Sequence, residues 1–223
     1  GAMGLLWYHH LSQASTHTRG GSNVSLLASN QAQLKAYELK SAKYQFTPYQ
    51  QQEMSIYPII YAKTADIKRA NIILLCIKSY HIASALENIA KDIPHRCMVI
   101  LAHNGMGTFE EAAEFLPSNQ PILAMLTTHG CLRRGILNIE HTGLGNSDVG
   151  LLSGEISTSQ QNKLSKVLSH ALPEVTFHQN IIEKQWLKLA INCVINPITA
   201  INDIDNGGVN DEKYADYLYL ALC

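Results

Sequence analysis

Three short, unbroken apolar runs alternate with more polar, helix-prone segments in the middle of the chain. Such runs are typical of strands that are covered on both faces of a parallel sheet. Strands that alternate with helices predict βαβ units with right-handed crossovers. The predicted strands are residues 71–77, 97–102 and 121–127, and the predicted helices are residues 80–91 and 107–116. We therefore predict an α/β domain built on a parallel sheet.

The segments on either side of this region carry weaker patterns. Before it we predict a helix over 4–13, a short buried strand over 23–28, a helix over 31–40, and an irregular stretch over 43–63 with a strand near 56–61. After it, the glycine-rich stretch 129–153 predicts antiparallel hairpins, and 158–171 predicts another helix. The pattern is helical from residue 180 onward, so we place a domain boundary near 179. The two predicted domains are residues 1–179 and 180–223.

The composition is that of a folded, nearly neutral protein. Of the 223 residues, 46% are hydrophobic and 16% are charged, which allows a sizeable core and excludes a disordered chain. A formal net charge of −1 gives no attraction to nucleic acid or to an anionic membrane surface. No apolar run approaches the roughly 20 residues of a membrane span. We therefore expect neither nucleic acid nor a membrane as a partner.

The five cysteines and ten histidines do not have the spacing of a metal site. The chain contains neither a CxxC nor an HExxH motif, so we expect no bound metal. The odd number of cysteines, most of them inside apolar or mixed segments, favours reduced thiols. These features predict a cytoplasmic protein.

The chain opens on Gly1-Ala2-Met3-Gly4, directly before the first predicted helix. These residues match the last two glycines of the GxGxxG pattern, which lies between the first strand and the first helix of a dinucleotide-binding fold. There, amide N–H groups at the helix start hold the phosphates. The alternative is a remnant of tag removal. Because the strand that precedes this pattern is missing, we expect the sequence to belong to a longer protein.

Polar residues follow each of the three predicted strands, and ligands of open α/β sheets bind at that edge. Lys78 follows the first strand and is either a ligand of a ribose or phosphate oxygen or a solvated loop lysine. Asn104, between His103 and Gly105, is either a positioned amide or an ordinary turn residue. His129 follows the third strand, and we interpret it as a structural histidine rather than a ligand.

The last predicted helix carries a polar stripe on an otherwise apolar surface. At about 100° per residue the stripe occupies an arc of about 80°. A helix that is apolar on its other faces is buried, so its stripe must line a wet or charged site. The stripe consists of Gln185, Lys188, Asn192, Asn196 and Thr199. The alternative is that Lys188 extends to solvent and the asparagines cap neighbouring loops.

A lysine in such a stripe suits the reduction of a 2-keto acid. That reaction places negative charge on the ketone oxygen, which an ammonium group can stabilise and protonate. Burial would lower the pKa of Lys188 towards neutrality, as a general acid requires. Asn192 and Asn196 can bind hydroxyl and carboxylate groups without adding charge.

Six segments, in order along almost the whole chain, resemble the ketopantoate reductase family. They are GAMGLLW (1–7), CIKSY (76–80), HNGMGTFEE (103–111), TTHG (127–130), HTGLGNSDVG (141–150), and KQWLKLAINCVINPITAI (184–201) with Asn206-Gly207. The resemblance implies a Rossmann-type domain followed by an all-helical C-terminal domain of the 6-phosphogluconate dehydrogenase type, truncated here. It also implies reduction of 2-dehydropantoate to pantoate with NADPH, on the route to pantothenate and coenzyme A. A homodimer remains open.

The resemblance also implies roles for individual residues. The cofactor NADP would contact Gly1, Ala2, Met3, Gly4, Lys78, Asn104 and the backbone near Cys131. Lys188 would be the proton donor. The substrate would be held by Asn104, Asn192, Asn196 and Asn206.

The sequence departs from the family's pattern in two respects. An arginine usually closes the second strand and binds the 2′-phosphate of NADP, but Ser29 or Ala28 stands there, which leaves open a preference for NADP over NAD. The family also continues past Cys223 through helices that carry a serine and a glutamate of the active site. The alternatives are another NAD(P)-dependent hydroxyacid or sugar-acid dehydrogenase, and a nucleotide-binding module without catalysis.

Overall fold

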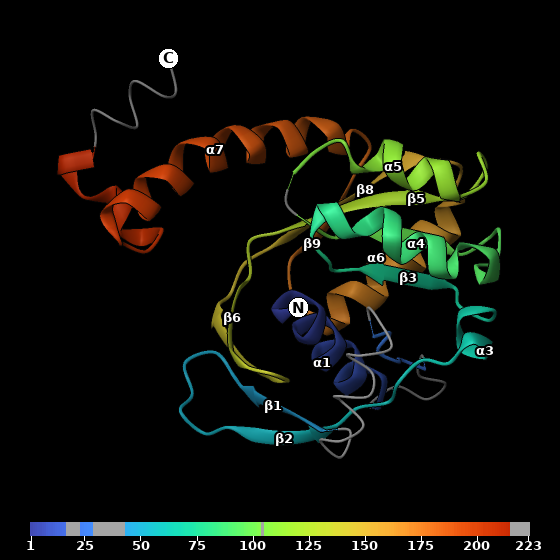
Figure 1. Cartoon of the computed structure of the whole chain (residues 1–223), viewed down its shortest axis with the longest axis horizontal. Helices are drawn as coiled ribbons and strands as arrows, with labels where there is room; N and C mark the ends of the chain where they lie inside the picture. Colours follow the sequence, from blue (N-terminus) through green and yellow to red (C-terminus); the bar gives the residue numbers. More distant parts are fainter. Residues whose placement is uncertain (17–22, 29–42, 104, 215–223) are drawn as a thin grey trace. The chain divides into compact units, whose positions relative to one another are not determined.

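The computed structural model describes residues 1–16, 23–28, 43–103 and 105–214. The helix predicted over 31–40 lies outside these ranges, as do Ser29 and Asn104. The chain divides into two compact units, Gly1–Ile181 and Ile182–Cys223. The first unit is α/β, and the described part of the second unit is helical (Figure 1). The predicted α/β fold class is confirmed.

A five-stranded sheet forms the centre of the first unit. The order β3-β4-β5-β8-β9 joins β3 (Ile72–Leu75), β4 (Met98–Leu101), β5 (Ile122–Thr127), β8 (Ser147–Ser153) and β9 (Val175–His178). The first three strands are parallel and confirm the three predicted strands.

The sheet is not parallel throughout, because β8, which lies within the stretch predicted to form antiparallel hairpins, runs antiparallel to β5. The chain leaves the sheet at the carboxyl end of β5 and returns to the same edge, where Thr128 N–H donates to the Asn146 carbonyl at 2.9 Å. A strand that starts where its neighbour ends must run in the opposite direction. β9 then pairs with β8 in parallel, so the sheet is mixed.

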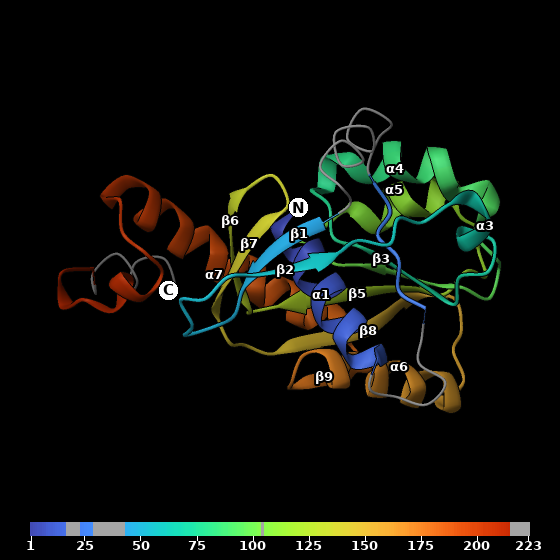
Figure 2. The same cartoon turned by 90° about the horizontal axis from the view of Figure 1, so that it is seen from below.

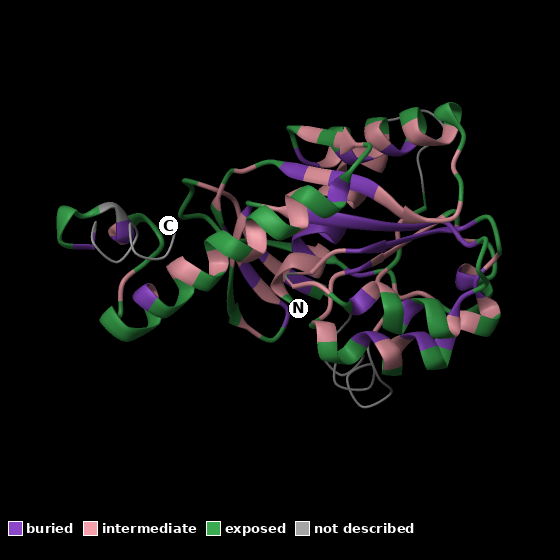
Figure 3. Cartoon of the chain, turned by 90° about the horizontal axis from the view of Figure 1, so that it is seen from above, coloured by how far each residue is buried: buried purple, intermediate pink, exposed green. Residues whose placement is uncertain are grey.

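Helices cover both faces of this sheet. On one face, α4 (Ile82–Ile89) and α5 (Thr108–Phe115) bury Leu86 and Ala112 against β3 and β4. On the other, α1 (Ala2–Thr16) and α6 (Thr158–Ala171) pack against β4 and β5. Figure 3 shows the strands of this sheet mostly buried between the helices.

The predicted bounds of α6 are confirmed because its start is encoded locally. The Ser157 hydroxyl accepts from the Gln160 backbone N–H, and the Gln160 side chain accepts from the Ser157 N–H. This capping box satisfies two amide groups that a helix start otherwise leaves without partners.

A second sheet of four strands curves around α1 (Figures 1 and 2). Its order is β2-β1-β7-β6, with β1 (Lys43–Thr47), β2 (Ser55–Pro58), β6 (Gly130–Gly135) and β7 (Asn138–Gly143). The side chains of Tyr44, Phe46 and Ile139 share one core with Leu6 and Trp7 of α1. The antiparallel β6–β7 hairpin confirms the prediction for the glycine-rich stretch.

Two predictions for the first third of the chain need correction. The strand predicted near 56–61 corresponds to β2, but the stretch 43–63 also contains β1, which was predicted to be irregular and pairs with β2 in a hairpin. The stretch 23–28 forms no strand, since within it Leu26 makes one isolated parallel bridge to Tyr61. In both cases the pairing partners, not the local composition, decide the structure.

The second unit is built on α7 (Ile181–Asn202), which is continuous through Pro197. Two short 3₁₀ turns follow, Gly207–Asn210 and Glu212–Tyr214. Ile198, Val209 and Tyr214 form a small core. The expected burial of the other faces of α7 is wrong: Trp186 is 59% exposed, because this core covers only the later part of the helix.

Gly154 occupies a position that admits no side chain, and we expect Gly154→Ala to lower the free energy of unfolding by about 2–4 kcal/mol. Its φ is +75°, and a Cβ would lie 2.5 Å from the carbonyl oxygen of Gln120. Gly107→Ala is the control, because its φ is +86° but no atom of the described residues lies within 4 Å of the added Cβ. Chemical unfolding of both variants measures the difference. Equal destabilisation would contradict the steric argument.

Candidate active site

The carboxyl ends of β3, β4 and β5 meet at one edge of the main sheet, because these strands are parallel and adjacent. Lys78 follows β3 and is exposed to solvent. His103 follows β4, and Thr128 follows β5. The structure thus brings Lys78 to the edge at which open α/β sheets bind ligands.

The Gly1–Gly4 turn begins α1 and lies against the end of β3. A Cβ at Gly4 would lie 3.3 Å from the Cβ of Cys76, and a Cβ at Gly1 would lie 3.7 Å from the Cys76 carbonyl oxygen. Between them, Ala2 and Met3 pack on the core. This close packing favours the interpretation of a nucleotide-binding turn over that of a tag remnant.

The same turn presents backbone donors. The N–H of Leu5 donates to the Gly1 carbonyl at 3.1 Å, and the amide groups before Leu5 have no acceptor within the helix. Donors at a helix start, reinforced by the helix dipole, suit a phosphate group. The residues present therefore fit the pyrophosphate of a dinucleotide.

The loop after β4 is held by a hydrogen bond that the sequence pattern did not suggest. His103 Nε2 and Thr108 Oγ1 lie 2.6 Å apart. Within this loop Gly105 and Gly107 have φ values of +106° and +86°, a region that favours glycine. The hydrogen bond joins His103, at the end of β4, to Thr108, the first residue of α5. Asn104 itself lies outside the described residues.

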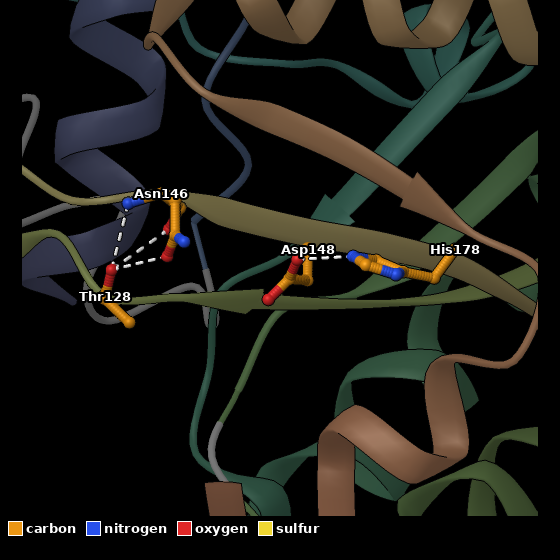
Figure 4. A network of polar contacts seen from close by, with 4 residues as sticks. All are labelled: Thr128, Asn146, Asp148 and His178. Carbon is orange, nitrogen blue, oxygen red and sulfur yellow. Dashed lines mark hydrogen bonds and ion pairs between the residues drawn. The ribbon is translucent and has the colours of Figure 1, made fainter. Parts of the chain in front are cut away.

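A second set of hydrogen bonds joins the residues that follow β5 to the residues that precede β8. The Thr128 hydroxyl donates to Asn146 Oδ1 at 2.7 Å (Figure 4). The Gly145 N–H donates to His129 Nδ1 at 3.1 Å, and His129 is buried. This agrees with the interpretation of His129 as a structural histidine.

The cysteines of the first unit are poor nucleophiles. Burial raises the pKa values of Cys76, Cys97 and Cys131 to about 12, so their thiols stay protonated at neutral pH. Cys131 lies on β6. Any contact of this residue with a cofactor would therefore use its backbone or its neutral side chain.

The predicted polar stripe is present on α7. Lys188, Asn192 and Asn196 follow one another at intervals of four residues and so share one face. Lys188 and Asn192 are partly buried, and the Asn196 carbonyl accepts from the Thr199 hydroxyl at 3.0 Å. Asn206 lies in the loop after α7 and is exposed. A lysine followed by two amides on the same helix face can protonate an oxyanion and orient a polar substrate.

Across the described ranges, no group of three or more histidine, cysteine or acidic side chains could hold a metal ion. The same residues include no helix that is long and apolar enough to span a membrane.

Two family models match the chain. Residues 1–154 match "Ketopantoate reductase PanE/ApbA", and residues 180–223 match "Ketopantoate reductase PanE/ApbA C terminal". The 2-dehydropantoate 2-reductase of Yersinia pestis is 37% identical over 156 residues, which are 70% of this chain and 48% of the relative. That of Vibrio cholerae is 31% identical over 153 residues, 69% of this chain and 51% of the relative.

Solved structures show the same fold at low sequence identity. The ternary structure of D-mandelate dehydrogenase with NADH and anilino(oxo)acetate has a TM-score of 0.81 and 18% identity, and covers 99% of this chain and 67% of its own. A ketopantoate reductase from Ralstonia solanacearum has a TM-score of 0.76 and 16% identity, and covers 100% and 72%.

The chain spans about half the length of the curated relatives that it matches. The first family model nevertheless covers more than half of this chain, and the C-terminal model covers the segment that carries Lys188, Asn192 and Asn196. On these matches, the chain belongs to the ketopantoate reductase family.

Proposed function

We propose that the intact protein reduces 2-dehydropantoate to (R)-pantoate with NADPH, a step of pantothenate and coenzyme A biosynthesis. The observation that carries the proposal is the row of Lys188, Asn192 and Asn196 on one face of α7, in the segment that matches the C-terminal family model. A dinucleotide-type glycine turn on the same chain supports it. Residues 1–179 are then the nucleotide-binding domain, and residues 180–223 belong to the substrate domain.

The first unit binds the cofactor in this proposal. The amide groups of Gly1, Ala2, Met3 and Gly4 hold the pyrophosphate, and Lys78 pairs with a ribose or phosphate oxygen. The backbone near Cys131 and the amide of Asn104 complete the set. When bound, the reduced nicotinamide supplies the hydride that adds to the ketone carbon.

The second unit binds and protonates the substrate. The Lys188 ammonium donates a hydrogen bond to the ketone oxygen, stabilises the negative charge that develops there, and transfers a proton to it. The amides of Asn192, Asn196 and Asn206 hold the hydroxyl and carboxylate groups, together with Asn104. The product is an alcohol, so hydride and proton balance the reaction.

The test is steady-state oxidation of NADPH by the intact protein, followed by the loss of reduced-nicotinamide absorbance. Ketopantoate is expected to be turned over with a higher kcat/KM than an aryl 2-keto acid such as benzoylformate. The reverse order would make the protein another 2-hydroxyacid dehydrogenase, a reading prompted by the fold that it shares with D-mandelate dehydrogenase. Binding of NADPH without turnover of any 2-keto acid would make it a non-catalytic nucleotide-binding module.

We expect the kcat/KM with NADPH to be about tenfold higher than the kcat/KM with NADH. This ratio corresponds to a difference of about 1.4 kcal/mol in transition-state stabilisation. Because neither Ala28 nor Ser29 carries a charge, the 2′-phosphate would be held by hydrogen bonds from the backbone and Ser29. Introducing Ser29→Arg is expected to increase the ratio. Equal kcat/KM values for NADPH and NADH in the unchanged protein would contradict this prediction and show that the protein uses both cofactors.

We further propose a cytoplasmic homodimer. The absence of a CxxC motif and the raised pKa values of the Cys76, Cys97 and Cys131 thiols fit a reducing compartment. A related ketopantoate reductase from Staphylococcus aureus is described as dimeric. Light scattering of the intact protein would show a dimer, and a monomeric mass would reject it.

A further inference from the structure

One arginine of β6 lies on the face of the second sheet that is turned towards α1. Cys131 of β6 packs on the core that α1 shares with this sheet, and side chains two positions apart along a strand lie on the same face. Arg133 is also paired directly with Ile139 of β7, which is 0% exposed in the same core. Directly opposed residues of an antiparallel pair share a face. Arg133 therefore faces α1, beside which β6 runs in both views (Figures 1 and 2).

Arg133 lies close to the glycine turn at the start of α1. Burial lowers the pKa of the Gly1 amino group, and the positive charge of Arg133 lowers it further. The thiols of Cys76 and Cys131 also act on Gly1, but burial raises the pKa values of both thiols to about 12. Because these thiols stay protonated at neutral pH, neither of them offsets the charge of Arg133.

The guanidinium of Arg133 keeps donors for a ligand. Its Nε–H donates to the Gly135 carbonyl at 3.2 Å, which holds the side chain on its own strand. The neighbouring Arg134 pairs with Glu140 at 2.7 Å, whereas Arg133 forms no ion pair with a described residue. The N–H groups of its two terminal nitrogens are therefore not engaged by a carboxylate of the described chain.

A pyrophosphate on the glycine turn needs more positive charge than the turn supplies. The start of a helix offers about half an elementary charge, and the backbone amides donate hydrogen bonds but are neutral. The pyrophosphate of a dinucleotide is doubly negative. An arginine adds a full positive charge and can donate two parallel N–H groups to one phosphate.

We propose that Arg133 binds the pyrophosphate of the nicotinamide dinucleotide, so that the phosphates lie between the Gly1–Gly4 turn of α1 and the inner face of β6. This inference rests on the proposed function, in which that turn holds the pyrophosphate. It assigns a charged side chain of β6 to the cofactor site, beside the backbone near Cys131. Because NADPH and NADH share the pyrophosphate, Arg133 serves both cofactors alike.

The test measures the dissociation constants of NADPH and NADH for the intact protein by titration, followed by the fluorescence of the reduced nicotinamide. Arg133→Ala is expected to raise both constants by about 10- to 100-fold, as for the loss of a charged hydrogen bond. Arg134→Ala is the matched control, since it removes the same kind of side chain one position further on, where it pairs with Glu140. The control should change each constant less than twofold.

Two outcomes of these titrations would overturn the proposal. Equal effects of Arg133→Ala and Arg134→Ala would show that only the general charge of β6 matters. A loss of affinity for NADPH without a loss for NADH would assign Arg133 to the 2′-phosphate instead of the pyrophosphate. Arg133→Gln also removes the charge and replaces Arg133→Ala in both titrations if the alanine variant does not fold.

The salt dependence of binding gives an independent measurement. Salt screens the attraction between an exposed guanidinium and a phosphate, so NADPH affinity should fall less steeply with salt in Arg133→Ala than in the unchanged protein. Arg133→Lys keeps the charge but not the paired donors, and should retain the steeper dependence. The same dependence in Arg133→Ala as in the unchanged protein would contradict a direct contact.

Binding and turnover together separate this inference from the proposed function. If both affinities depend on Arg133 but the protein reduces no 2-keto acid, the inference holds and the proposed function fails. If the protein reduces ketopantoate and Arg133→Ala binds NADPH as tightly as the unchanged protein, the function holds and the inference fails. An intact protein that binds neither dinucleotide would reject both.

Discussion

Replacing Lys188 with alanine is expected to lower kcat for ketopantoate by about 10²- to 10⁴-fold, the usual range for loss of a general acid. Lys188 shares its face of α7 with two asparagines, whose amides cannot supply a proton at neutral pH. The dissociation constant of NADPH should not change, because the proposed cofactor residues lie in the other unit. The measurement is steady-state NADPH oxidation together with NADPH titration. Lys163→Ala, on the exposed face of α6, is the control and should keep full activity.

A second substitution at this position separates charge from proton transfer. Lys188→Arg keeps the positive charge, but a guanidinium does not give up its proton at neutral pH. If proton transfer dominates, Lys188→Arg should be almost as slow as Lys188→Ala. Recovery of most of the activity would reduce the role of Lys188 to electrostatic stabilisation. Full activity of Lys188→Ala would remove this residue from the mechanism.

Features encoded within a few residues of sequence could be predicted. The apolar runs of β3, β4 and β5 and the Ser157–Gln160 capping box of α6 are local, and all four elements are confirmed. The stripe on α7 could also be found, because its spacing of four residues matches the helical period. To predict that these side chains share one face of one helix, the rest of the fold did not have to be known.

Features that depend on distant partners could not be predicted. In β1 the buried Tyr44 and Phe46 alternate with Lys43 and Gln45, but this short pattern lies in a stretch rich in glutamine, tyrosine and proline. The direction of β8 follows from where the chain re-enters the sheet, which no local pattern records. The Asp148–His178 and Thr128–Asn146 contacts join residues 30 and 18 positions apart. Only the assembled sheet brings them together.

Four histidines gather between α1 and the second sheet, and the sequence showed only that two of them are adjacent. His9 is buried, lies 2.8 Å from the Tyr44 hydroxyl through its Nδ1, and stacks on Phe46. The rings of His10 and His129 each lie 5.5 Å from that of His141. Burial lowers the pKa of His9 to about 4 and that of His10 to about 3, and it also lowers the pKa values of the other two.

These histidines make the folded state sensitive to acid. His9 and His10 stay neutral in the folded protein at pH 5, because their pKa values there are about 4 and about 3, whereas in the unfolded chain histidine has a pKa of about 6.5 and takes up a proton. Below about pH 6.5 the unfolded state therefore binds more protons, and the free energy of unfolding falls as pH falls. Carboxylates titrate mainly below pH 5, with unperturbed pKa values of about 4. Histidines therefore dominate the interval between pH 7 and pH 5.

Lowering the pH from 7 to 5 is expected to reduce the free energy of unfolding by about 2 kcal/mol for His9 and by about the same amount for His10. Urea unfolding at the two pH values measures the loss. In His10→Phe the loss in the free energy of unfolding between pH 7 and pH 5 should be smaller by about 2 kcal/mol, because phenylalanine cannot be protonated. The substitution removes no hydrogen bond of His10 Nε2, which has no partner within the described residues. His95→Gln, at an exposed position, should leave the loss unchanged. Equal stability at pH 7 and pH 5 would mean that the cluster accepts protons without unfolding.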